Sequence, residues 1–118
     1  MPQHLFVYGT LHPDRAPAEI AAAVRHLRLF GPGTLRATLY DLGDYPGLVI
    51  HPNRPNIVHG TIFALPDDPE ILSALDRYED FRPSDPNNSL FVRAIHPVTL
   101  PDGATLDCWV YLYNQPLP

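Results

Sequence analysis

The sequence lacks lysine altogether and contains only one cysteine and three serines. Without lysine, the chain cannot use a Schiff base, a Walker-type phosphate-binding lysine or a lysine general base. The single cysteine, Cys108, excludes an internal disulfide. No serine lies in the Gly-x-Ser-x-Gly motif that presents a nucleophile in many hydrolases. These absences leave few side chains that can act in catalysis.

The chain is also short of positive charge and of long apolar segments. Its formal net charge is −5 and its arginines form no cluster, so neither nucleic acid nor an anionic membrane is an expected partner. No apolar run approaches the roughly 20 residues that a membrane span requires. Residues 1–4 (MPQH) have neither the basic nor the apolar part of a signal peptide. We therefore expect a cytoplasmic protein.

Histidine and cysteine show no metal-binding pattern. None of the six histidines has an H-x-x-x-H or Cys/His spacing, so no metal site is predicted. Cys108 lies beside Trp109 in an apolar segment. We expect it to be a small buried hydrophobic residue rather than a nucleophile, although the spacing also permits a Cys–His pair.

The apolar pattern predicts one α+β domain over residues 1–118. Strands are expected at residues 4–8, 34–41, 48–50, 57–65, 90–100 and 105–113, and helices at 16–29 and 67–80. Gly31 and Gly33 are expected to end the first helix, and Pro97 to break the strand at 90–100. Leu35, Ala37 and Leu39 are expected to share one face of strand 34–41. Gly60 indicates a bulge or a close backbone approach. Short strands and tight turns favour a sheet that curls into a small barrel.

Glu79 lies inside the apolar stripe of the predicted helix at 67–80. At about 100° per residue, it projects between Leu72 and Leu75. The other members of this arc are Ile71, Ala74 and Tyr78. Polar residues are placed on the opposite, solvent-facing side: Ser73, Asp76, Arg77 and Asp80.

A carboxylate directed at a core must be paired, protonated or used. Burial raises the pKa of such a group toward the range in which proton transfer is efficient, which makes Glu79 a candidate general acid/base. Alternatively, the side chain reaches solvent at the helix end or pairs with Arg77, Arg82 or Arg93.

A second candidate feature is the tetrapeptide that follows the first strand, Tyr8, Gly9, Thr10 and Leu11. Glycine lets a ligand approach the backbone, and successive N–H groups after a strand can form an anion-binding nest. Thr10 adds a hydroxyl group. The alternative interpretation is an ordinary exit from a strand into a loop.

Four segments in order resemble the γ-glutamylcyclotransferase-like family, in particular its γ-glutamylamine cyclotransferase and avirulence-induced-gene-like branch. They are residues 6–11 (FVYGTL), 39–48 (LYDLGDYPGL), 58–63 (VHGTIF) and 75–79 (LDRYE). The resemblance implies a small mixed barrel with two main helices. It implies that Tyr8, Gly9, Thr10 and Leu11 hold the glutamyl part of a small-molecule substrate. It also implies that Glu79 is the catalytic acid/base.

The reaction that this resemblance implies is intramolecular and needs no metal or cofactor. The α-amine of a γ-glutamyl group attacks its own γ-carbonyl, and the products are 5-oxoproline and a free amine or amino acid. Loops at 44–47 and 82–88 are expected to contact the amine side. The identity of this amine and the oligomeric state are not assigned by the sequence.

Two positions depart from the pattern of the family. Asp80 stands where members often have glycine, and Phe91 stands where they often have tyrosine ahead of the arginine at position 93. Three alternatives accompany the enzyme hypothesis. The first is a non-catalytic module that binds a γ-glutamyl or carboxylate ligand. The second is an enzyme that removes a γ-glutamyl protecting group from a biosynthetic intermediate, with a larger leaving group, and the third is a structural or interaction protein in which Glu79 is paired at the surface.

Overall fold

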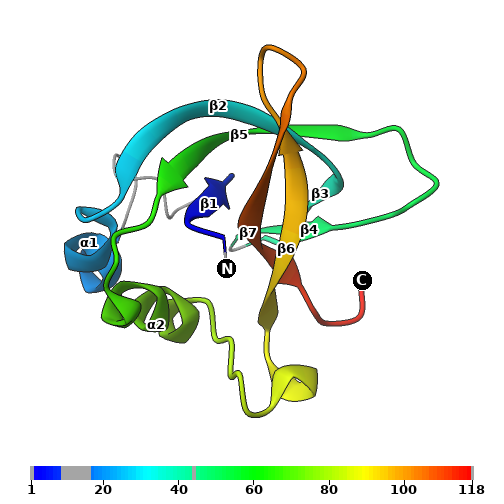
Figure 1. Cartoon of the computed structure of the whole chain (residues 1–118). Coiled ribbons are helices and arrows are strands. Elements are labelled where there is room, and N and C mark those ends of the chain that lie inside the picture. Colours follow the sequence, from blue (N-terminus) through cyan, green and yellow to red (C-terminus); the bar gives the residue numbers. More distant parts are fainter. Residues whose placement is uncertain (1, 9–16, 44, 118) are drawn as a thin grey trace.

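A computed structural model describes residues 2–8, 17–43 and 45–117, and its centre is a closed five-stranded barrel (Figure 1). The strand order is β1-β5-β2-β6-β7. β1 pairs antiparallel with β5 and parallel with β7, which closes a mixed barrel. The bounds are β1 His4–Val7, β2 Arg28–Arg36, β5 Ile57–Ala64, β6 Phe91–Thr99 and β7 Thr105–Tyr113. The predicted α+β fold with a small mixed barrel and two main helices is confirmed.

Smaller elements complete the described part of the chain. A two-stranded sheet is formed by β3, Thr38–Asp41, and β4, Pro46–Val49. The helices are α1, Ala18–Val24, and α2, Pro69–Tyr78, and a short 3₁₀ helix η1 spans Pro86–Asn88. α1 and α2 contact each other beside the barrel (Figure 1). Within the described ranges, no helix is both long enough and apolar enough to cross a membrane.

Strand alternation divides the core into two clusters. Phe6 of β1 and Val110 of β7 belong to one cluster. Their neighbours Leu5, Val7 and Tyr111 belong to a second cluster, which includes the buried apolar residues of both helices. Because successive strand residues point to opposite faces, β1 and β7 separate these two clusters. Apolar burial on both faces of these central strands holds the helices against the barrel.

α2 begins with a capped first turn. Asp68 caps the helix, with its side chain accepting a hydrogen bond from the Glu70 N–H at 3.0 Å, and Pro69 occupies the first turn. The acidic cap satisfies an N–H group that has no partner within the helix. Proline has no N–H group, so it leaves one fewer to be satisfied. Ile71 and Leu75 are buried against the barrel. This anchoring directs the end of α2, with Glu79, toward the strands.

The predicted first helix at 16–29 is wrong in its second half. α1 ends at Val24, and β2 begins at Arg28 and continues through Gly31 and Gly33, which were expected to stop the helix. Backbone pairing with β5 takes this segment into the barrel, and the register shifts between Leu29 and Gly31. A seven-residue helix provides few internal hydrogen bonds, so pairing with a long neighbouring strand overrides local helix preference.

The single strand predicted at 34–41 is also wrong. It is divided at Ala37, whose N–H donates to the Asn56 carbonyl at 3.1 Å, and β3 leaves the barrel to pair with β4. Leu35 and Ala37 are buried, whereas Leu39 is 45% exposed. The two halves therefore belong to different sheets and do not share one face.

Three expectations about individual residues have clear outcomes. β6 is not broken at Pro97, which remains in register with Asp107. Within the part of the chain that the structure describes, β6 pairs with β2 only at Thr99, so the edge of β6 at Pro97 needs no N–H donor. Gly60 is a close-approach site, since a Cβ there would lie 2.6 Å from the Val7 carbonyl oxygen. Cys108 is fully buried, as predicted, and burial raises its pKa to about 11.

Candidate active site

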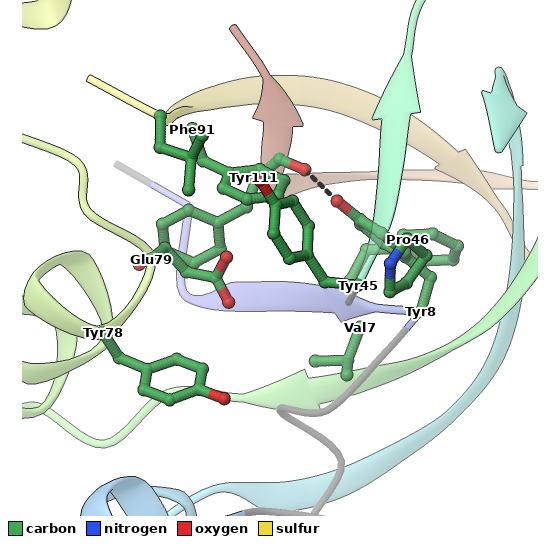
Figure 2. A pocket seen from close by; sticks show the side chains of 10 residues that line it. Val7, Tyr8, Tyr45, Pro46, Tyr78, Glu79, Phe91 and Tyr111 are labelled. Atoms are coloured by element: carbon green, nitrogen blue, oxygen red, sulfur yellow. Dashed lines mark hydrogen bonds between the residues drawn. The ribbon is translucent and has the colours of Figure 1, made fainter. Parts of the chain in front are cut away.

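A pocket of about 150 Å³ lies where the end of α2 faces β1, β7 and the start of β4 (Figure 2). Its walls are mainly aromatic, and Glu79 is its only charged lining residue among those described. The lining residues are Phe6, Val7, Tyr8, Tyr45, Pro46, Tyr78, Glu79, Leu90, Phe91 and Tyr111. The pocket therefore places one carboxylate inside an apolar cavity rimmed by phenol groups.

Glu79 is held at the point where α2 ends. It is the C-cap residue, and the following residue, Asp80, has a left-handed φ of 54°. The Phe81 N–H donates to the Asp76 carbonyl at 2.8 Å, and the Asp80 N–H donates to the Arg77 carbonyl at 3.2 Å. This pair of bonds is a Schellman motif, which fixes the last turn of a helix. The left-handed geometry explains physically why glycine suits the position of Asp80.

The Glu79 side chain points into the pocket toward the surrounding phenol groups (Figure 2). Burial raises its pKa from the ordinary 4.5 to about 7, because the low-polarity surroundings disfavour the charged form. No ion pair among the described residues involves Glu79. Arg82 is paired with Asp80 and Arg93 with Asp76. A carboxyl group that titrates near neutrality can both accept and donate a proton at physiological pH.

Tyr8, the first residue of the predicted binding tetrapeptide, lines the same pocket. Its hydroxyl donates a hydrogen bond to the Tyr111 carbonyl at 2.5 Å (Figure 2). Burial, followed by the negative charge of Glu79, raises the pKa of the Tyr8 phenol above its usual range. Tyr8 and Glu79, which are far apart in the sequence, therefore face one cavity. Gly9, Thr10 and Leu11 lie outside the described residues.

Asp76 was predicted to face solvent, and this prediction is wrong: the residue is only 6% exposed. Its Oδ1 accepts hydrogen bonds from Arg93 Nε at 2.8 Å and from the Tyr111 hydroxyl at 2.7 Å. Its Oδ2 accepts from Arg93 Nη2 at 3.1 Å. Asp76 was assigned to the solvent-facing side because it is charged. Its position around the helix axis, only about 60° from Glu79, instead places it next to the apolar side. That angle was the available signal for burial.

Several pocket residues were not singled out in the sequence. Leu90 lies just before β6, and Tyr111 lies in β7. Tyr45 and Pro46 lie in the loop at 44–47 that was expected to contact the leaving amine, whereas none of the described lining residues comes from 82–88. Their convergence depends on strand register and loop path. Local periodicity could not have identified them.

Phe91, the departure noted in the sequence, belongs to an aromatic cluster at the pocket wall. The centroid of its ring lies 5.8 Å from the ring centroid of Tyr45 and 5.7 Å from that of Tyr113. These edge-on contacts are favourable between aromatic rings. The absence of a hydroxyl at this position therefore makes this part of the wall apolar.

The chain belongs to the γ-glutamyl cyclotransferase, AIG2-like family, since the sequence profile described as "Gamma-glutamyl cyclotransferase, AIG2-like" matches residues 5–118. This finding confirms the predicted family. A comparison with curated proteins gave no match.

Solved structures share the fold. An AIG2-like protein from Mus musculus has a TM-score of 0.73 and 24% identity, over 98% of this chain and 80% of the mouse protein. A structure titled "Gamma-glutamyl cyclotransferase" has a TM-score of 0.68 and 17% identity, over 93% of this chain and 65% of its own length. A protein from Arabidopsis thaliana has a TM-score of 0.66 and 21% identity, over 98% and 72% of the two chains.

The described residues offer little for a bound metal. No three of their histidine, cysteine, aspartate and glutamate side chains come together in a group that suits a metal ion. What the site provides is a titratable carboxyl group in a small, mostly apolar pocket, with phenol groups around it. This arrangement suits proton transfer to and from a small polar molecule.

Proposed function

We propose that this protein is a γ-glutamyl cyclotransferase that releases 5-oxoproline and a free amine or amino acid from a γ-glutamyl compound. The observation that carries the proposal is the position of Glu79: a partly buried carboxyl group in the pocket, without an ion-pair partner among the described residues, whose pKa is about 7. Membership of the family supports the class of reaction. Glu79 supplies the proton-transfer group that such a reaction requires.

In the proposed reaction, Glu79 begins as a carboxylate and removes a proton from the α-ammonium of the substrate. The freed amine attacks the γ-carbonyl carbon and forms the ring C–N bond. Protonated Glu79 then donates to the departing nitrogen as the original amide C–N bond breaks. The ring nitrogen loses a second proton, so two protons in total pass from the α-nitrogen to the leaving amine. A group with a pKa near the working pH is suited to both directions of transfer.

Substrate folding is the second requirement of this mechanism, because the amine and the carbonyl must meet. Holding both groups in a reactive geometry can contribute up to about 7–11 kcal/mol in favourable cases. We assign this task to Tyr8, which lines the pocket, and to Gly9, Thr10 and Leu11, on the strength of the family resemblance. The backbone N–H groups of that loop would bind an anionic group of the substrate or the developing oxyanion.

The test is Glu79→Gln, a change that keeps the shape of the side chain but removes its ability to carry a proton. We expect 5-oxoproline release from a panel of γ-glutamyl amines and amino acids to fall by about 10²-fold or more. Asp80→Asn is the matched control, because it neutralises the next carboxylate, which does not line the pocket.

Near-normal turnover by Glu79→Gln would refute the acid/base role. Thermal stabilisation of the wild-type protein by the same γ-glutamyl compounds, without any 5-oxoproline, would instead identify a non-catalytic binding module.

A further inference from the structure

Two carboxylates lie near the end of α2, Asp76 and Glu79, and Arg93 pairs with the first of them. Asp76 and Glu79 lie one turn apart on α2, about 60° apart around its axis. The guanidinium of Arg93 binds Asp76 through two hydrogen bonds, at 2.8 and 3.1 Å. Glu79 has no arginine partner among the residues described. Of the two carboxylates, Asp76 is therefore paired with an arginine, and Glu79 is not paired with any arginine that the structure describes.

Three side chains hold Arg93 in this arrangement: Asp76, Trp109 and Phe81. Arg93 of β6 is directly opposite Tyr111 of β7, so both side chains reach Asp76 from neighbouring strands. The guanidinium carbon lies 4.1 Å from the centre of the Trp109 ring and 5.7 Å from that of Phe81. The Arg93 side chain is only 13% exposed. A bidentate pair between aromatic rings leaves this cation little freedom to turn toward Glu79.

The consequence for Glu79 follows from elementary electrostatics. An arginine beside a carboxylate lowers the pKa of that carboxyl group by about 1–3 units, because the cation favours the charged form. Glu79 would then be a weak proton acceptor at neutral pH and a poor donor to a leaving amine. Its raised pKa arises from burial alone. Proton exchange by Glu79 therefore depends on Arg93 being bound elsewhere.

We propose that Asp76 is a positioning residue, which holds the Arg93 guanidinium away from Glu79 and so leaves the Glu79 carboxyl group free to exchange protons with the substrate. The role in turnover rests on the proposed function, but the placement of Arg93 does not. The Tyr111 hydroxyl assists Asp76, since it donates to the same oxygen as Arg93 Nε. Tyr111 also lines the pocket and connects the ion pair to its wall.

The other titratable groups among the described residues that line the pocket are phenols. They are Tyr8 from β1, Tyr45 from the loop before β4, Tyr78 from α2 and Tyr111 from β7. Phenols are neutral at physiological pH. The Asp76–Arg93 pair, which the Tyr111 hydroxyl links to the pocket wall, is therefore a source of charge that a substitution can unmask. The sign of the effect depends on which partner is removed.

The experiment is an NMR titration of the Glu79 side-chain carboxyl carbon, assigned by its loss in Glu79→Gln. In Asp76→Asn, we expect the midpoint to fall by about 1–3 pH units, because the unpaired guanidinium turns to Glu79. In Arg93→Gln, the uncompensated Asp76 anion should move the midpoint upward. The double variant Asp76→Asn/Arg93→Gln should return it close to the wild-type value. Opposite shifts with mutual cancellation would not result from general loosening of the fold.

Arg82→Gln is the matched control, because this arginine pairs with Asp80 at the exposed end of the helix. It should leave the Glu79 midpoint unchanged. An unchanged midpoint in Asp76→Asn would overturn the proposal. If that variant does not fold, Arg93→Gln decides, and a midpoint that does not rise there would overturn the proposal equally.

Activity gives an independent readout. The acidic limb of the kcat/KM profile should move to lower pH in Asp76→Asn and return in the double variant, in parallel with the NMR midpoint. A wild-type protein that makes no 5-oxoproline would refute the proposed function, while the titrations would still decide whether Asp76 keeps Arg93 from Glu79.

Discussion

Replacing Glu79 by glutamine should stabilise the protein at alkaline pH and change its stability little at acidic pH. Glutamine resembles the protonated form of glutamate, which is the form that the buried pocket favours. In the wild-type protein, raising the pH ionises Glu79 in the unfolded chain well before it ionises in the folded protein. The folded state then loses stability that the glutamine variant retains.

The size of this effect follows from the pKa of Glu79, which rises from 4.5 to about 7 on folding. A raised carboxyl pKa means that the folded protein binds more protons than the unfolded chain between these two values. The free energy of unfolding therefore falls as the pH rises through this window and levels off above it. At about 1.4 kcal/mol for each pKa unit, the loss amounts to about 3 kcal/mol by pH 8.

The assay is urea unfolding of the wild type and Glu79→Gln at pH 4 and pH 8, with the variant expected to gain about 3 kcal/mol relative to the wild type between the two conditions. Glu70→Gln is the matched control, because Glu70 is exposed on the same helix. A difference between Glu79→Gln and the wild type that stays constant from pH 4 to pH 8 would refute the argument, because it would mean that burial does not perturb this carboxyl group.

Three further substitutions or reactions test the structure around the site. Asp80→Gly should raise the free energy of unfolding by about 1 kcal/mol in urea melts, because glycine adopts the left-handed φ of 54° without strain, and unchanged stability would contradict the helix-end geometry. Gly60→Ala should lower it by about 1–3 kcal/mol, since the new Cβ would lie 2.6 Å from the Val7 carbonyl oxygen, and a neutral effect would show that β1 and β5 are less closely packed. The thiol of Cys108 should react with a thiol reagent at pH 8 only in denaturant, because the side chain is fully buried and its pKa is about 11, and rapid labelling of the folded protein would disprove this burial.

Prediction from the sequence was accurate where a pattern repeats locally. The position of α2 and the orientation of Glu79 toward its apolar side both follow from residues within one helix. The same reasoning was wrong for the segment from Arg28 to Gly33, where pairing with β5 decides the conformation. It was also wrong for Asp76, because a carboxylate can be buried once distant partners neutralise it.

The sequence alone determined the class of fold, the family and the identity of the unusual carboxylate, because helix periodicity and ordered motifs are properties of the linear chain. Tertiary structure alone decided which carboxylate is paired. Arg93 and Tyr111 reach Asp76 because the register of β6 and β7 sets them opposite each other. That register also brings Tyr111 and Phe91 to the wall of the pocket that Glu79 enters. The pKa of Glu79 depends on this closed, apolar surrounding, which no segment of the chain can form by itself.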